Sequence, residues 1–164
     1  MILKAFAAAI VVFTPLGASQ SFGQVLPTPT AAPAAAIQAV RRVVADFGKQ
    51  LRSVSVLAPP ADVAAGMQKA YAAFVTPDLL ESWKRAPLNA PGKRASSPSP
   101  ERIDIDTIAA MGRDAFTVVG KVILLTDQER RNGGIFQANP VTMTVVHRKG
   151  KWLISNYVEK EARQ

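Results

Sequence analysis

The fold is decided by VTMTVVHRKGKWLISNYVE, Val141–Glu159, which predicts two strands joined by a tight turn at Lys149-Gly150. If Arg148 pairs with Lys151, the register of the whole hairpin is set. That register pairs His147 with Trp152, Val145 with Ile154, Met143 with Asn156, and Val141 with Val158. Because side chains alternate across a strand, these residues share one face. All are apolar except His147 and Asn156, so we expect this face to be buried.

The composition indicates a basic globular protein of single-domain size. The chain has 164 residues, of which 48% are hydrophobic and 20% are charged, enough to bury a core. The absence of cysteine excludes disulfides, thiol catalysis and thiolate zinc sites. With a single histidine we expect no histidine-cluster metal site and no cofactor. The net charge of +8 predicts attraction to anionic surfaces.

Residues 1–23 have the organisation of a signal peptide. Lys4 supplies a positive charge, Ala5–Phe13 form an uncharged and mostly apolar run, and small residues follow, with cleavage fitting after Ser19 or Gly23. The run is shorter than the ~20 residues that span a bilayer. We therefore expect an exported protein, periplasmic or extracellular, without a transmembrane span in its mature form. An uncleaved leader that anchors the chain is the alternative.

Residues 24–33, QVLPTPTAAP, predict an extended linker rich in proline and alanine, followed by one domain over 34–164. Ala34–Val54 is predicted to be a helix, because its apolar residues recur at helical spacing. They are Ile37, Val40, Val44, Phe47, Leu51 and Val54.

A second face of this helix is basic. It carries Arg41, Arg42, Lys49 and Arg52, with Asp46 as the acid among them. One hypothesis is electrostatic contact with an anionic lipid, glycan or nucleic acid surface; the other is a solvated face. No aromatic side chain lies among these cations, so we expect no nucleic-acid partner.

Two more helices are predicted, from about Ala61 to Phe74 and from Thr76 to Arg85, with Thr76-Pro77 as a start signal. Tyr71 and Trp83 on these helices line a pocket in one interpretation and form ordinary core in the other. The following segment, 86–100, is rich in proline and predicts a long loop. Its cations, Lys93 and Arg94, either face an anionic ligand or lie on the surface.

From residue 101 the pattern has the period of strands. Arg102–Asp106 alternates, so Asp104 and Asp106 share a face, either as paired catalytic carboxylates or as a solvated edge. Ala115–Thr126 is apolar on both faces and predicts a central strand, in which Gly120 indicates a bulge or bend. Asp127–Gln137 is predicted to be a polar loop.

This order of elements defines an α+β fold with N-terminal helices and an antiparallel sheet of about four strands. Four segments resemble the nuclear-transport-factor-2-like (ketosteroid-isomerase-like) superfamily, in particular its exported members: FVTPDLLESW (74–83), RIDI (102–105), FTVVGKVILL (116–125) and PVTMTVVHRKGKWLISNY (140–157). The resemblance covers about residues 35–160 and concerns the order of elements. It implies a cone-shaped fold, with the helices packed on a strongly curved sheet around a cavity that the hairpin lines.

The first functional hypothesis is an exported, non-catalytic domain that binds a small apolar ligand or an envelope protein. Its predicted ligand-binding residues are Tyr71, Trp83, Met143, His147, Trp152 and Asn156. A homodimer through the sheet is also consistent with the pattern. The alternatives are a cavity enzyme of isomerase or dehydratase type that uses His147 as a base, and an assembly component of an envelope secretion apparatus. No catalytic residue is assigned, because no acid is placed beside His147 on the hairpin face.

Overall fold

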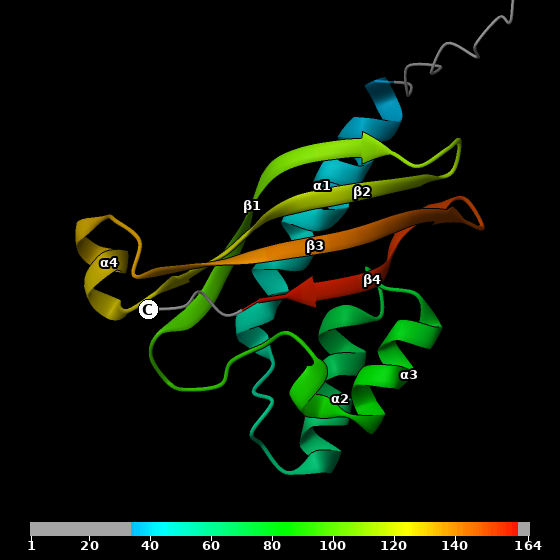
Figure 1. The fold of residues 1–164 in the computed structure, drawn as a ribbon. Coiled ribbons are helices and arrows are strands. Elements are labelled where there is room, and N and C mark those ends of the chain that lie inside the picture. The colour runs from blue at the N-terminus through cyan, green and yellow to red at the C-terminus, as the bar shows by residue number, and fades with distance from the viewer. Residues whose placement is uncertain (1–33, 161–164) are drawn as a thin grey trace, which may run out of the picture. The chain divides into compact units, whose positions relative to one another are not determined.

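The computed structural model of the protein describes residues 34–160 (Figure 1). The predicted signal peptide, 1–23, and the predicted linker, 24–33, lie outside the described residues. Within 34–160, no helix combines the length and the apolar character that a crossing of the bilayer requires.

The N-terminal half of the described chain is helical, as the apolar spacing predicts. Its elements are α1 (Ala34–Gln50), a 3-10 turn (Leu51–Ser53), α2 (Pro60–Tyr71), α3 (Pro77–Arg85) and a second 3-10 turn (Pro87–Asn89). Both α2 and α3 begin with proline in the first turn, where the missing N–H costs no helical hydrogen bond.

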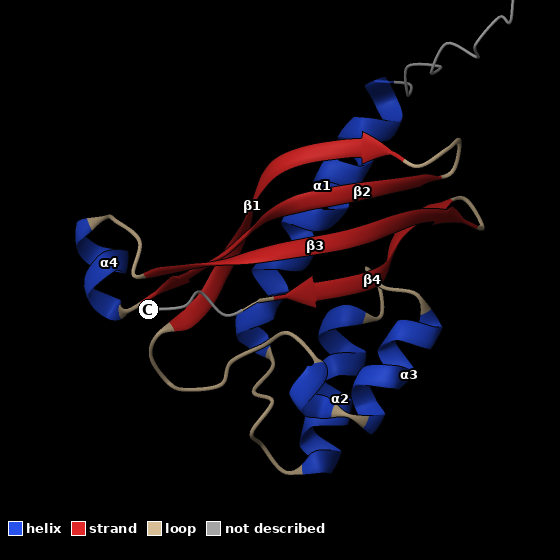
Figure 2. Ribbon diagram, in the orientation of Figure 1, coloured by secondary structure: helices blue, strands red, loops and turns tan. Residues whose placement is uncertain are grey.

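The C-terminal half forms an antiparallel sheet of four strands in the order of the sequence. The strands are β1 (Ser99–Ala110), β2 (Ala115–Leu125), β3 (Gln137–Arg148) and β4 (Lys151–Glu159). In Figures 1 and 2, α1 crosses one face of the sheet, and α2 and α3 lie beside β4. The α+β class and the antiparallel sheet with helices N-terminal to it are therefore confirmed.

A short helix, α4 (Asp127–Asn132), joins β2 to β3 where the sequence predicts a loop. Thr126 starts it. The Gln128 N–H donates to Thr126 Oγ1 (3.2 Å), and the Thr126 N–H donates to Glu129 Oε2 (2.9 Å). The Thr-x-x-Glu spacing of a capping box was the available signal for this helix.

Two glycines allow close backbone approaches. A Cβ atom on Gly48 would lie 2.7 Å from the backbone nitrogen of Ile103, so α1 can cross β1 at this point only with glycine. A Cβ on Gly120 would collide with the carbonyl oxygen of Asp104. The predicted irregularity near Gly120 lies in its partner strand, because the register of β1 against β2 shifts between Ile105 and Thr107.

The β3–β4 hairpin follows the predicted register from its turn to the pair Val145–Ile154, and then departs from it. Ser155 is inserted as a bulge, so Thr144 pairs with Asn156 and Met143 pairs with Tyr157. The predicted pairs Met143–Asn156 and Val141–Val158 are therefore wrong. As a consequence Asn156 is exposed, and Tyr157 takes its place on the buried face with 8% exposure.

The core between the helices and the sheet is centred on an aromatic cluster. Phe47 of α1 contacts four rings, with centroids 5.2–6.3 Å away; they belong to Tyr71, Phe74, Trp83 and Tyr157. Phe47 itself is fully buried. Such ring pairs contribute about 0.5–1.5 kcal/mol each beyond the burial of their area.

The chain also covers part of the outer edge of β4. The Ile154 N–H donates to the Phe74 carbonyl (2.8 Å), and the Thr76 N–H donates to the Ile154 carbonyl (2.9 Å). These bonds lay the α2–α3 connection beside the strand and satisfy groups that would otherwise offer a free edge.

Candidate functional site

A cavity of about 510 Å³ opens where β1 begins and β4 ends. Its wall includes Arg94 and Ala95 of the long loop, Leu124 of β2, Gln137 and Asn139 of β3, and Glu159 of β4. Leu51, Pro98 and Pro100 add apolar wall. The volume falls in the range of small-molecule sites.

A chain of hydrogen bonds follows the strand ends at this cavity. Gln137 Nε2 donates to Asn139 Oδ1 (2.6 Å), and Asn139 Nδ2 donates to Glu159 Oε1 (2.8 Å). The Tyr157 hydroxyl donates to the other carboxylate oxygen, Oε2 (2.7 Å). Asn139 is only 5% exposed, so this amide is fixed in the wall of the cavity.

Both tyrosines of the protein lie beside this end of the sheet, and both are held neutral. Burial raises the pKa of Tyr157 well above its ordinary value, and the neighbouring Glu159 carboxylate raises it further. Burial likewise raises the pKa of Tyr71, again with a smaller contribution from Glu159. The Tyr71 hydroxyl donates to the Pro91 carbonyl (2.8 Å), which ties the core to the loop over the cavity.

The loop that carries Arg94 is anchored on both sides. The Lys93 N–H donates to the Val54 carbonyl (2.8 Å), and the Val56 N–H donates to the Lys93 carbonyl (3.1 Å). Arg94 Nη2 donates to the carbonyls of Leu88 (2.9 Å) and Ala90 (3.3 Å). These bonds hold the guanidinium at the cavity, close enough that its charge partly opposes the rise in the pKa of Tyr157.

Three of the predicted ligand-binding residues lie in the closed core. Tyr71 and Met143 are fully buried and Trp83 is 3% exposed, with the Trp83 ring stacked on Phe47. None of the three lines the 510 Å³ cavity. Their predicted role in binding stays a prediction.

The other three lie away from the cavity. His147 and Trp152 form a pair next to the β3–β4 turn, with ring centroids 4.8 Å apart, and Trp152 packs on Phe116. His147 Nδ1 is 3.9 Å from Asp114 Oδ1, and both side chains are exposed. Asn156 lies on the outer face because of the bulge at Ser155. The structure thus does not gather the six predicted residues into one site.

The predicted basic face of α1 is partly neutralised. Lys49 pairs with Asp46 (2.8 Å) and Arg52 pairs with Glu101 (3.1 Å). In the described part of the chain, Arg41 and Arg42 are exposed and take part in no ion pair.

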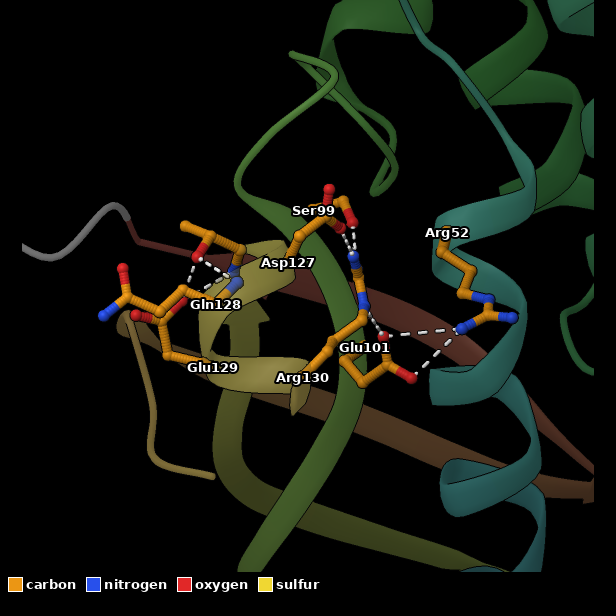
Figure 3. A network of polar contacts seen from close by, with 8 residues as sticks. Arg52, Ser99, Glu101, Asp127, Gln128, Glu129 and Arg130 are labelled. Carbon is orange, nitrogen blue, oxygen red and sulfur yellow. Dashed lines mark hydrogen bonds and ion pairs between the residues drawn. The ribbon is translucent and has the colours of Figure 1, made fainter. Parts of the chain in front are cut away.

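Figure 3 shows how Glu101 joins the 3-10 turn after α1 to α4. Its carboxylate accepts from Arg52 on one side and from Arg130 (3.1 Å) on the other. Arg130 also pairs with Asp127 (3.0 Å) and donates to the Ser99 hydroxyl. The pKa of Arg130 is raised, and its hydrogen bond to the Glu101 carboxylate is the largest cause. In this network the charges of Arg52 and Arg130 are balanced by those of Glu101 and Asp127.

Asp104 and Asp106, which the sequence places on one face of a strand, pair with different cations. Asp104 pairs with Arg102 (2.8 Å), and Asp106 lies 3.8 Å from Lys121, so these two carboxylates are engaged separately on the surface. Within 34–160, no group of acids and histidine is arranged to hold a metal ion.

The chain matches no known family model, no curated protein and no solved structure. The candidate site therefore stands on its own geometry. Apart from Arg94, the sequence analysis missed its polar residues. The available signal was the two-residue spacing of Gln137 with Asn139 and of Tyr157 with Glu159, which puts each pair on one face of a strand.

Proposed function

We propose that the protein is an exported, non-catalytic domain that binds a small ligand with an apolar body and a hydrogen-bond-accepting head. The observation that carries this proposal is the cavity of about 510 Å³ with a fixed polar wall at Asn139 and Glu159. Leu51 and Leu124 offer apolar surface to the body of the ligand. Nη2 of Arg94 already donates to a backbone carbonyl, but its Nε and Nη1 groups can donate hydrogen bonds to the head of the ligand.

The arrangement favours binding over catalysis. In the cavity wall the Glu159 carboxylate accepts hydrogen bonds from both Asn139 and Tyr157, and burial keeps Tyr157 protonated. A general base must lie within hydrogen-bonding reach of the substrate. His147, the residue of the enzyme hypothesis, lies next to the turn at the other end of the hairpin and does not line the cavity.

The same proposal includes a cone-shaped, nuclear-transport-factor-2-like fold. The order of helices and strands supports it, as do the bulges of β1 and β4, which bend strands and increase their twist.

We also propose a homodimer through the outer face of the sheet. The row Thr107–Val119–Thr142–Val158 crosses all four strands and is exposed, with Val119 at 39% and Val158 at 47%. The next row, Ala109–Thr117–Thr144–Asn156, is also uncharged. Two copies of a chain with net charge +8 repel each other elsewhere, so an uncharged face is where they can meet.

Native mass spectrometry of the protein purified from its source tests these points together. We expect a mature mass that begins near residue 20 or 24, a bound small molecule, and a dimer. Ala95→Trp places a large side chain in the cavity from an exposed position and should remove the bound mass. The matched control, Ala110→Trp, places the same side chain at an exposed position in the last residue of β1 and should retain it.

Each part has its own contrary result. An adduct that survives Ala95→Trp would place the ligand outside this cavity, and no adduct on the wild-type protein would remove the binding proposal. Retention of Met1 would contradict cleavage after export. A dimer that persists in Val119→Lys would exclude the outer face as its interface.

A further inference from the structure

The two turns at the end of the sheet opposite the cavity lie side by side. The β1–β2 turn contains Met111–Asp114, and the β3–β4 turn contains Lys149-Gly150. The His147 N–H donates to the Asp114 carbonyl (2.8 Å), which joins the two turns (Figure 1). Side chains from both turns therefore form one surface, which we call the hairpin end.

The hairpin end carries cations without partners in the described structure. They are Arg113, Arg148, Lys149 and Lys151, and all four are exposed. None takes part in an ion pair among residues 34–160. Asp114 is the one acid within these turns, and it faces His147 instead.

Lys149 occupies a position that lysine disfavours. Its φ is +50° and that of Gly150 is +76°, the left-handed pair that a two-residue turn needs. Asn or Asp is the usual residue at the first of these positions, and Lys149 is the one non-glycine residue with positive φ in the described chain. The left-handed backbone at Lys149 carries a local conformational cost, and such a cost is often found at functional positions.

We propose that the hairpin end docks on the surface of an anionic phospholipid membrane. Each Lys or Arg near such a surface strengthens binding about fivefold. Exposed Met111 (60%) lies in the same turn as Arg113, and Trp152 follows Lys151 with its ring partly exposed. Apolar and aromatic groups beside cations suit the headgroup region of a bilayer, where both find partners.

A membrane fits this surface better than a nucleic acid does. The cations lie on two turns and on the strand residues that flank them, at one end of the molecule, and Lys151 also lines a small cavity beside α2 and α3. The Trp152 ring is packed on Phe116 and His147, so it offers no free face for base stacking.

The test is co-sedimentation of the full chain with vesicles of phosphatidylglycerol and phosphatidylcholine in equal amounts, and with pure phosphatidylcholine vesicles. The hairpin-end variant carries Arg113→Gln, Arg148→Gln, Lys149→Asn and Lys151→Gln. The matched control removes as many positive charges from cations that already have carboxylate partners: Lys49→Gln, Arg52→Gln, Lys84→Gln and Arg102→Gln.

We expect the hairpin-end variant to lose binding to anionic vesicles by more than about a hundredfold, and the control to lose less than about tenfold. Lys149→Asn alone should raise the melting temperature, because asparagine suits the turn, and should weaken binding about fivefold. Equal losses in the two variants, or wild-type binding that is the same on both vesicle types, would overturn the proposal. Binding to heparin or duplex DNA without binding to vesicles would also overturn it, in favour of another polyanion.

Discussion

The two ends of the sheet both carry several cations, but they differ in how these cations are partnered. At the cavity end Arg52 and Arg130 share Glu101, Arg130 also pairs with Asp127, and Arg94 donates to the backbone carbonyls of Leu88 and Ala90. At the hairpin end the four cations of the turns pair with no acid in the described structure.

This difference separates charge that serves the fold from charge that is available to a partner. Exposed ion pairs contribute at most about 1 kcal/mol, so the network at Glu101 gives little stability, but it balances the charges of Arg52 and Arg130 with those of Glu101 and Asp127. The unpaired cations of the hairpin end keep their field, which extends about one Debye length, ~8 Å at physiological salt. Net charge alone therefore does not locate a binding surface; the positions of the acids do.

The largest expected effect distinguishes how the two ends are packed. Trp83 is 3% exposed and contacts Tyr157 near the cavity end of β4, whereas Trp152 is half-buried at the hairpin end. We expect Trp83→Ala to lower the free energy of unfolding by about 3–5 kcal/mol and Trp152→Ala by about 1–2 kcal/mol. Urea unfolding followed by circular dichroism measures both. Equal costs would mean that the hairpin end is as tightly packed as the core.

A second prediction concerns the buried tyrosines at the cavity end. The pKa values of Tyr71 and Tyr157 are raised in the folded state, so folding favours the protonated form of each. Their contribution to stability is complete below the unfolded pKa of about 10. It is then lost, as pH rises through the window up to the folded pKa values, at about 1.4 kcal/mol per pH unit for each tyrosine.

Urea unfolding at pH values on either side of about 10 measures this loss, and tyrosinate absorbance should appear only as the protein unfolds. The control is Tyr71→Phe, which removes one of the two groups and should halve the slope. The hairpin end has no tyrosine, so early tyrosinate absorbance in the folded protein would show that the cavity end opens to solvent.

The sequence predicted α1, α2, α3 and the four strands because their patterns are periodic, but it did not predict α4, which is short and polar. It predicted the hairpin register only as far as Ile154. The bulge at Ser155 depends on local backbone pairing and does not change the alternation of apolar and polar residues in a way that would reveal it. Tyr157 on the buried face could not be foreseen for the same reason. The pairing of Lys49 with Asp46 is a local i,i+3 relation, whereas the pairing of Arg52 with Glu101 joins residues far apart in the sequence and needs the tertiary structure.

The smallest expected effect tests the electrostatic difference directly. Glu101→Gln removes the carboxylate that Arg52 and Arg130 share, while Arg130 keeps Asp127 and Ser99. We expect the free energy of unfolding to fall by no more than about 1 kcal/mol, because the pairs are partly exposed. Glu81→Gln is the matched control, since it breaks only the single pair with Lys84 on α3. Co-sedimentation with anionic vesicles should increase more for Glu101→Gln than for Glu81→Gln, because the first leaves Arg52 without an acid and Arg130 with Asp127 alone, whereas the second changes the pairing of Lys84 only. If the two variants bind equally, net charge rather than the pairing of cations governs attraction to the membrane, and the contrast between the two ends of the sheet has no electrostatic consequence.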